Sequence, residues 1–342
     1  MQKRFLITRL SAIGDAILTM PLAAALRDAV PESHIVWIAE RAAASLLEGH
    51  SCVDRLIVVR KGWLKRIAEI RRVRRALRAE EIDCAIDPQS LTKSSMAARL
   101  SGAPCRIALA RPIGRELAPW LATVRVAPVR QHVVDRQLEL LKPLGITPSV
   151  PEFRVPVYEA ARERIAAWLT TSSLDRPFAI INPSAAWGSK RWPLERYADV
   201  ARQVAPALEL PLVVVWAGEA ERGMAQRIVE RSDGACRLAP PTTLPELAEL
   251  VRRAAFFVGS DTGPLHLAAA VGTPCVGLYG PTLPEICGPY GSDHEVLQVY
   301  YQDGTSRERR GADNRALRAI SVEMVVQACH RVRHRIAGRS AA

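Results

Sequence analysis

Residues 256–282, FFVGSDTGPLHLAAAVGTPCVGLYGPT, predict a strand, a tight turn, a helix and a second strand in direct succession. Apolar residues form the two strands at 256–258 and 275–278, the turn lies at 259–263, and Pro264 suits the start of a helix. Two such strands joined through a helix require a right-handed crossover in a parallel sheet. The stretch therefore predicts an α/β fold.

The turn places hydrogen-bonding groups at the carboxyl edge of that sheet. Asp261, Thr262 and His266 supply polar side chains, and Gly263 lets a ligand approach the backbone closely. Free amides and the positive end of a helix dipole at such a turn form an anion site, for which phosphate is the natural ligand. A simpler reading stays open, in which Asp261 only caps the helix.

Length and composition indicate a globular protein of two domains. The 342 residues suffice for two cores, and 49% apolar with 24% charged residues is typical of a folded chain. We find no run of eighteen apolar residues, and the N-terminus enters a strand at Arg4–Thr8 without the features of a signal peptide. We therefore expect a cytoplasmic location without a membrane-spanning helix.

The seven cysteines and the net charge restrict which metals, disulfides and binding partners can be expected. No two cysteines form a C-x-x-C pair, which predicts buried free thiols, and His330 and His334 lack the carboxylate motif of a metal site. The net charge of +12 indicates an anionic partner: nucleic acid, anionic lipid or a phosphorylated substrate.

Much of this charge lies in residues 60–78. Nine Lys and Arg residues stand there against Glu69 alone, a net charge of +8, and apolar residues at helical spacing predict one amphipathic helix. Such a face is often merely solvated. If it is not, the repulsion among these cations requires an anionic partner. Arg60 and Lys61 are then best placed to bind a substrate, and Arg74 and Arg75 to bind a membrane surface.

Two further residues of the first half follow predicted strands. Asp15 comes after the strand Arg4–Thr8 in a loop that matches neither the P-loop nor G-x-G-x-x-G, and Lys93 follows the strand Cys84–Asp87. The carboxyl edge of an open parallel sheet is where ligands bind. For Asp15 the alternative is a helix cap.

In the second half, residues 182–193 form a loop that contains Ser184 and Lys190, after a strand at 178–181. We find no D-x-D motif, so we expect no bound metal. Residues 302–314 are predicted to be a loop, and residues 321–336 the last helix.

These motifs together resemble the lipopolysaccharide heptosyltransferases of glycosyltransferase family 9. The resemblance rests on the Asp-Thr-Gly turn at 261–263, on His266, on YGPT at 279–282 and on Lys190 before Trp-Pro. The pattern at 87–94 is closest to the first, Kdo-adding type, although Ser90 stands where the family has Gly.

The resemblance implies a GT-B fold, two Rossmann-like domains facing across a cleft. It assigns residues 1–150 to an acceptor-binding domain, with a linker at 143–156, and residues 151–320 to a domain that binds the ADP-sugar. Residues 321–342 then form a C-terminal helix that crosses back to the first domain.

The implied activity is inverting transfer of heptose from ADP-L-glycero-D-manno-heptose to Kdo-lipid A in synthesis of the lipopolysaccharide inner core. The resemblance makes Asp15 the general base and assigns the donor to Ser184, Lys190, Asp261, Thr262, Gly263 and His266. It assigns the acceptor to Arg60, Lys61 and Lys93. We expect no cofactor, no nucleic acid, a monomer, and peripheral binding to the anionic inner face of the inner membrane.

Three alternatives compete with this interpretation. A related glycosyltransferase using another nucleotide sugar would share the same motifs. A basic nucleic-acid-binding protein is supported only by the charge, because no RNP or helix-turn-helix signature is found. A dinucleotide-dependent oxidoreductase is weakened by the missing G-x-G-x-x-G.

Overall fold

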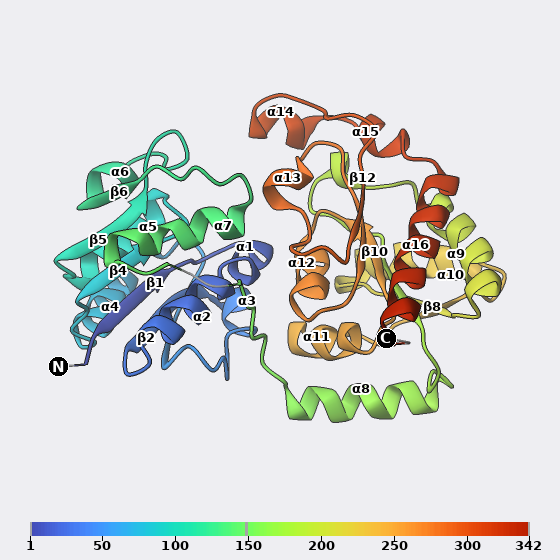
Figure 1. Ribbon diagram of the computed structural model, residues 1–342, viewed down its shortest axis with the longest axis horizontal. Helices are drawn as coiled ribbons and strands as arrows, with labels where there is room; N and C mark the ends of the chain where they lie inside the picture. Colours follow the sequence, from blue (N-terminus) through green and yellow to red (C-terminus); the bar gives the residue numbers. More distant parts are fainter. Residues whose placement is uncertain (1, 148–149, 341–342) are drawn as a thin grey trace. The chain divides into compact units, whose positions relative to one another are not determined.

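A computed structural model describes residues 2–147 and 150–340 of the protein (Figure 1). The chain divides into two compact units, Met1–Pro156 and Val157–Ala342. Among the described residues, no helix has both the length and the apolar content that a membrane crossing requires.

The first unit contains a six-stranded parallel sheet in the order β3-β2-β1-β4-β5-β6. Its strands are β1 (Arg4–Thr8), β2 (His34–Glu40), β3 (Arg55–Val59), β4 (Cys84–Asp87), β5 (Cys105–Leu109) and β6 (Val124–Val126). Its helices are α1 (Ile13–Ile17), α2 (Met20–Ala29), α3 (Arg41–Ala44), η1 (Trp63–Lys65), α4 (Ile67–Arg78), α5 (Thr92–Ser101), α6 (Ala118–Leu121), α7 (Val133–Leu138) and η2 (Glu139–Leu144).

The second unit repeats this topology with the strand order β12-β11-β10-β7-β8-β9, again parallel throughout. Its strands are β7 (Ala179–Asn182), β8 (Leu212–Val214), β9 (Cys236–Leu238), β10 (Phe257–Ser260), β11 (Cys275–Leu278) and β12 (Glu295–Leu297). Its helices are α8 (Glu159–Thr171), η3 (Gly188–Lys190), α9 (Leu194–Leu208), α10 (Gly218–Glu230), α11 (Leu244–Arg252), α12 (Gly263–Ala270), α13 (Pro284–Cys287), α14 (Ser306–Gly311), α15 (Arg315–Arg318) and α16 (Val322–Ser340).

Each unit therefore has a topological switch point between its first and fourth strands. In the first unit β1 pairs with β2 on one side and β4 on the other, and in the second β7 lies between β8 and β10. Successive connections leave the sheet in opposite directions at such a point, which opens a crevice at the carboxyl ends of the two strands. The α/β prediction and the Rossmann-like organisation of both halves are confirmed.

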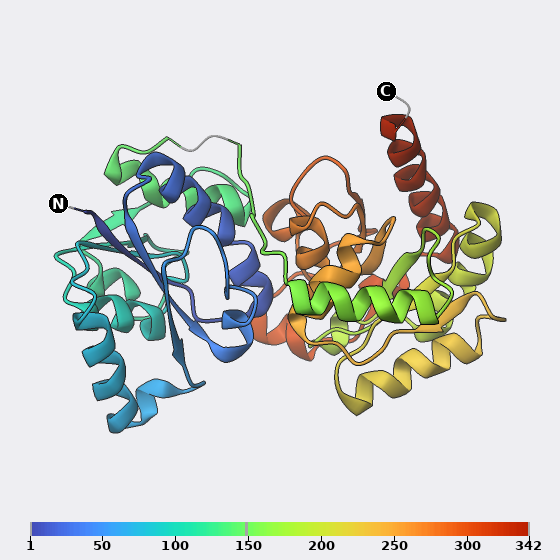
Figure 2. The ribbon, with the colours of Figure 1, turned by 90° about the horizontal axis from the view of Figure 1, so that it is seen from below.

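Apolar runs place the strands in two separate cores. Leu6, Val36 and Ile57 belong to one core, in which Val73 and Leu77 of α4 cover the sheet. In the second unit, α16 packs against α9, β11 and β12, and α8 packs against α11. The view from below shows α8, in green, on the near side of this unit (Figure 2). The crossing of the last helix to the first domain stays a prediction.

Two sequence predictions were wrong in detail, and a third was right in one of its two alternatives. Residues 60–78 are not one helix: Gly62 adopts a left-handed backbone with φ 73°, a 3₁₀ turn follows, and α4 begins only at Ile67. Residues 302–314 are not simply a loop, because they contain α14. The sequence also predicts a helix at 16–29, in which Pro21 either forms a kink or marks the true start. The structure has the second arrangement: α1 ends at Ile17, and Pro21 is the second residue of α2, where a proline is tolerated.

Candidate active site

The predicted donor residues converge at the switch point of the second unit. Ser184 and Lys190 follow β7, whereas Asp261 and Thr262 follow β10, the neighbouring strand. Thr262 immediately precedes α12, Gly263 is its first residue and Pro264 its second. Because the first turn of a helix has amides without helical acceptors, this end of α12 presents N–H groups at the carboxyl edge of the sheet.

Asp261 is the centre of a buried ionic cluster. Its Oδ2 lies 2.5 Å from Nζ of Lys190, and its Oδ1 lies 3.0 Å from Nε2 of His266. Burial alone would raise the pKa of Asp261, but the hydrogen bond with His266 and the charge of Lys190 outweigh it and hold that pKa well below its ordinary value. Asp261 is therefore a carboxylate at neutral pH, so the bound ring nitrogen of His266 carries a proton.

Two buried polar atoms in this cluster have no partner among the residues that the structure describes. They are the hydroxyl of Ser184 and Nδ1 of His266. Buried groups of this kind normally find a hydrogen bond, and leaving one unmade costs about 1–3 kcal/mol. The site thus has unsatisfied capacity that a polar ligand would meet.

Asn182 is a member of this cluster that sequence reasoning missed. It ends β7, and its amide nitrogen donates to Oγ1 of Thr262 at 3.2 Å, which ties the two loops of the switch point together. The available signal was its position, because a polar residue directly after a buried apolar strand lies at the sheet edge.

Asp15 lies at the switch point of the first unit, after β1. It is the third residue of α1, and its Oδ2 accepts a hydrogen bond from the Ala12 amide at 3.1 Å. Its side chain is 48% exposed, and the guanidinium of Arg9 is 3.9 Å from Oδ1. The carboxylate therefore takes part in capping the helix and also faces solvent.

Lys93, on α5 after β4, contacts the loop that follows β1 and leads to Asp15. Its Nζ bonds the hydroxyl of Ser11 and lies 3.2 Å from Oε1 of Glu40. Arg60 and Lys61 directly follow β3, which is separated from β1 by β2, and both are exposed. In the described part of the chain, no hydrogen bond or ion pair joins them to Asp15 or Lys93.

Ser90, the position where the resemblance leads us to expect glycine, lies in a turn. Its backbone is left-handed, with φ 49°, which explains why glycine suits this position. Three hydrogen bonds hold Ser90 there: its N–H and hydroxyl both donate to Asp87, and its hydroxyl accepts from the amide of Leu109.

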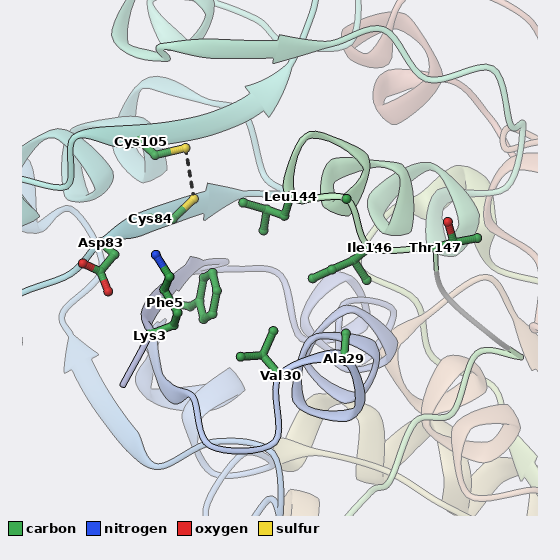
Figure 3. A pocket seen from close by; sticks show the side chains of 11 residues that line it. Lys3, Phe5, Ala29, Val30, Asp83, Cys84, Cys105, Leu144, Ile146 and Thr147 are labelled. Carbon is green, nitrogen blue, oxygen red and sulfur yellow. Dashed lines mark hydrogen bonds between the residues drawn. The ribbon is translucent and has the colours of Figure 1, made fainter. Parts of the chain in front are cut away.

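The first unit contains a cavity of about 630 Å³ at the end of the sheet opposite to Asp15 and Lys93. It is lined at the beginnings of β1, β4 and β5 by Lys3, Phe5, Cys84 and Cys105, as Figure 3 shows. The two sulfur atoms are 3.2 Å apart, and burial raises the pKa of the Cys84 thiol. These are reduced, packed thiols at the amino ends of the strands, so the cavity is separate from the candidate site.

No metal-binding group emerges from the described residues: no three His, Cys, Asp or Glu side chains are arranged to hold an ion. All seven cysteines are free, and five of them are buried.

Comparison with known proteins gives a consistent family. Residues 70–315 match the model of glycosyltransferase family 9 (heptosyltransferase). Lipopolysaccharide heptosyltransferase 1 of Pseudomonas aeruginosa is 30% identical over 300 residues, which cover 84% of this chain and 81% of that protein.

Solved structures agree in fold over nearly the whole length. A glycosyl transferase family 9 protein from Veillonella parvula superposes with a TM-score of 0.84 at 27% identity, covering 97% of this chain and 98% of its own. The Escherichia coli heptosyltransferase WaaC with ADP-2-deoxy-2-fluoro heptose gives a TM-score of 0.77 at 26% identity, covering 96% and 99%.

Proposed function

The chain belongs to glycosyltransferase family 9, the heptosyltransferases, and on that premise we propose that it transfers heptose from ADP-L-glycero-D-manno-heptose to a Kdo-lipid A acceptor. The observation that carries the proposal is the cluster of Lys190, Asp261 and His266 at the start of α12. Cation, carboxylate and helix N-terminus together suit a sugar diphosphate, and a relative was solved with an ADP-heptose analogue.

The donor diphosphate binds at this cluster. Lys190 pairs with Asp261, and a diphosphate offers the same ammonium a more highly charged partner. As the bond from the anomeric carbon to the diphosphate breaks, negative charge grows on the leaving ADP. Lys190 and the amides of α12 stabilise that charge, which favours the transition state over the ground state.

The acceptor reacts at the first unit, where Asp15 is the general base. The acceptor hydroxyl attacks the anomeric carbon, its proton passes to the Asp15 carboxylate, and ADP leaves from the opposite face, which inverts the configuration. The 48% exposure of this side chain is compatible with access by a sugar hydroxyl. Lys93, Arg60 and Lys61 bind the phosphate and carboxylate groups of the acceptor.

The acceptor carries acyl chains, so the enzyme works on the inner face of the inner membrane as a peripheral cytoplasmic protein. Arginines on the exposed face of α4 support this, because five of its twelve residues are Arg: Arg71, Arg72, Arg74, Arg75 and Arg78. Basic residues near a surface of anionic lipid contribute about 1 kcal/mol each.

Two measurements test the proposal. A thermal-shift panel of nucleotide sugars is expected to give its largest stabilisation with ADP-heptose, since bound ligand raises the midpoint of unfolding. Mass spectrometry of Kdo-lipid A after incubation with enzyme and ADP-heptose is then expected to show addition of one heptose. Preference for a different nucleotide sugar, with no product from ADP-heptose, would favour the related-glycosyltransferase alternative.

A further inference from the structure

α14 is attached to the loop that carries Lys190, although more than a hundred residues separate them in the sequence. The hydroxyl of Ser189 donates to the carbonyl oxygen of Arg309 at 2.6 Å. Just beyond α14, the side chain of Asn314 donates to the carbonyl oxygen of Arg191 at 2.8 Å. These bonds hold α14 next to η3 in the second unit.

This attachment brings a second cation to the candidate donor site. Nζ of Lys190 lies 4.4 Å from the centre of the Trp187 ring, and Cζ of Arg310 lies 4.9 Å from the same centre. Cations at these distances are attracted by the negative face of an indole ring. Trp187 therefore holds two positive side chains, one from the loop after β7 and one from α14.

The charge of Arg310 is not balanced nearby. No carboxylate forms an ion pair with it within residues 2–147 and 150–340, and the side chain is exposed. Glu308, the acidic residue of α14, instead accepts from the backbone amide of Thr305 in a capping box. Asp261 already pairs with Lys190. An anion that approaches both side chains therefore balances the charge of Arg310.

We propose that Arg310 is a second phosphate-binding residue of the donor site, which holds the diphosphate of a nucleoside diphosphate sugar together with Lys190. The inference rests on the proposed function in one respect, namely that the donor contains a diphosphate. A guanidinium donates two parallel hydrogen bonds to phosphate oxygens, which an ammonium does not, so the two side chains have different tasks. Contact with Trp187 holds the guanidinium of Arg310 near the loop of Lys190.

The alternative is that Arg310 only packs on Trp187. The two roles predict different effects of losing Arg310 on the affinity for ligands with and without phosphate. A phosphate contact affects ADP and leaves adenosine unchanged, whereas a packing defect in the loop affects both. A phosphate contact also adds to the salt dependence of ADP binding, because salt screens the attraction between charges.

The test is titration calorimetry on the full chain with ADP, and with adenosine as a competing ligand, at low and high salt. Arg310→Ala is expected to raise the Kd for ADP roughly tenfold or more at low salt, the size expected for a lost hydrogen bond between charged groups. The Kd for adenosine should stay the same. Arg310→Lys should recover part of the loss, because it restores the charge without the paired geometry.

Arg307→Ala is the matched control, since Arg307 is exposed on the same helix and forms no ring contact with Trp187 in the described chain. It should bind ADP like the wild type. The inference is overturned if Arg310→Ala binds ADP as tightly as the wild type, or if it weakens ADP and adenosine equally. A wild-type chain that fails to bind ADP would instead overturn the proposed function.

Discussion

At the scale of single residues, Asp15 shows how two roles share one side chain. Sequence reasoning left open whether it caps a helix or acts as a base, and the structure shows a carboxylate that accepts the Ala12 amide and remains 48% exposed. A local hydrogen bond was foreseeable because Asp favours the first turn of a helix. The exposure was not, since it depends on how neighbouring loops pack.

Asp15→Asn separates these roles. An Asn side chain offers the same carbonyl oxygen to the Ala12 amide but does not accept a proton from the acceptor. We expect kcat to fall by at least roughly 10²-fold, the lower end of what general-base catalysis contributes. The donor Kd and the Tm should barely change. Steady-state kinetics with a melting curve check this, and near-normal kcat would reduce Asp15 to a capping residue.

Lys190→Ala addresses the donor cluster. We expect ADP to raise the Tm of the wild-type protein and to raise that of the variant much less, because the main cation for the diphosphate is gone. The variant without ligand should itself be less stable, since Asp261 is left buried without its ammonium partner. Only the shift caused by ADP is therefore compared. Lys65→Ala, at an exposed lysine of the other unit, serves as control, and an equal ADP shift in all three proteins would remove Lys190 from the site.

Single helices and strands were predictable where a local sequence pattern marks their ends. Cys84–Asp87 and Cys275–Leu278 have the predicted bounds because they are short apolar runs between polar turns. α14 was missed although Thr305 and Glu308 form a capping box three residues apart, the same arrangement that Thr243 and Glu246 form at the start of α11. In residues 60–78 the helical spacing of apolar residues masked Gly62, whose left-handed backbone delays the start of α4.

The segment before α4 carries the acceptor prediction. Arg60 and Lys61 are exposed in the loop after β3, outside the helix, where they are available to a bound anion. Reversing both to Glu is expected to raise the acceptor KM strongly, because attraction becomes repulsion, and to change the donor KM little. Kinetics with each substrate varied in turn measure the two constants. A parallel rise in both would indicate disturbed folding and would contradict the assignment.

α4 itself carries the membrane prediction. Val73 and Leu77 face the core, whereas Arg74 and Arg75 are exposed. Reversing Arg74 and Arg75 to Glu should weaken binding to vesicles of anionic lipid in a sedimentation assay, most clearly at low salt, where surface charges are least screened. Turnover of a short, soluble acceptor should be nearly unchanged. Full retention of vesicle binding at low salt would exclude α4 as the membrane contact.

At the scale of the whole molecule, the repeated strand order explains why the sequence alone indicates where the candidate sites lie. Apart from Arg60 and Lys61, which follow β3, the residues singled out in both units follow the first and fourth strands, which are adjacent at the switch point. Parallel topology alone thus brought Lys93 to the loop of Asp15 and Lys190 to Asp261. What topology does not determine is the attachment of a late segment such as α14, which depends on side-chain contacts far apart in sequence.

Each unit also contains a buried histidine that we expect to make the free energy of unfolding sensitive to acid. In the first, His50 donates from Nε2 to the carbonyl of Phe153 and accepts the amide of Cys52 on Nδ1, and in the second His294 bonds Tyr290 and Cys275 in the same manner. Both rings must be neutral to accept on Nδ1. Burial is the largest cause and lowers the pKa of each ring. The carbonyl hydrogen bonds oppose this, as does the charge of Asp293 at His294, whereas the charges of Arg154 at His50 and of Arg335 at His294 lower the pKa further.

These lowered pKa values determine how the free energy of unfolding changes with pH. Between the folded pKa and the ordinary value of 6.5, the unfolded chain binds more protons than the folded one, so stability rises with pH. The contribution is complete above about pH 7 and is lost as the pH falls below 6.5, at up to about 1.4 kcal/mol per pH unit for each histidine. Urea unfolding between pH 5 and 8 should show this slope, and His50→Gln and His294→Gln should each reduce it. If both variants keep the full wild-type slope, other groups are responsible and the two rings are not held neutral by the fold.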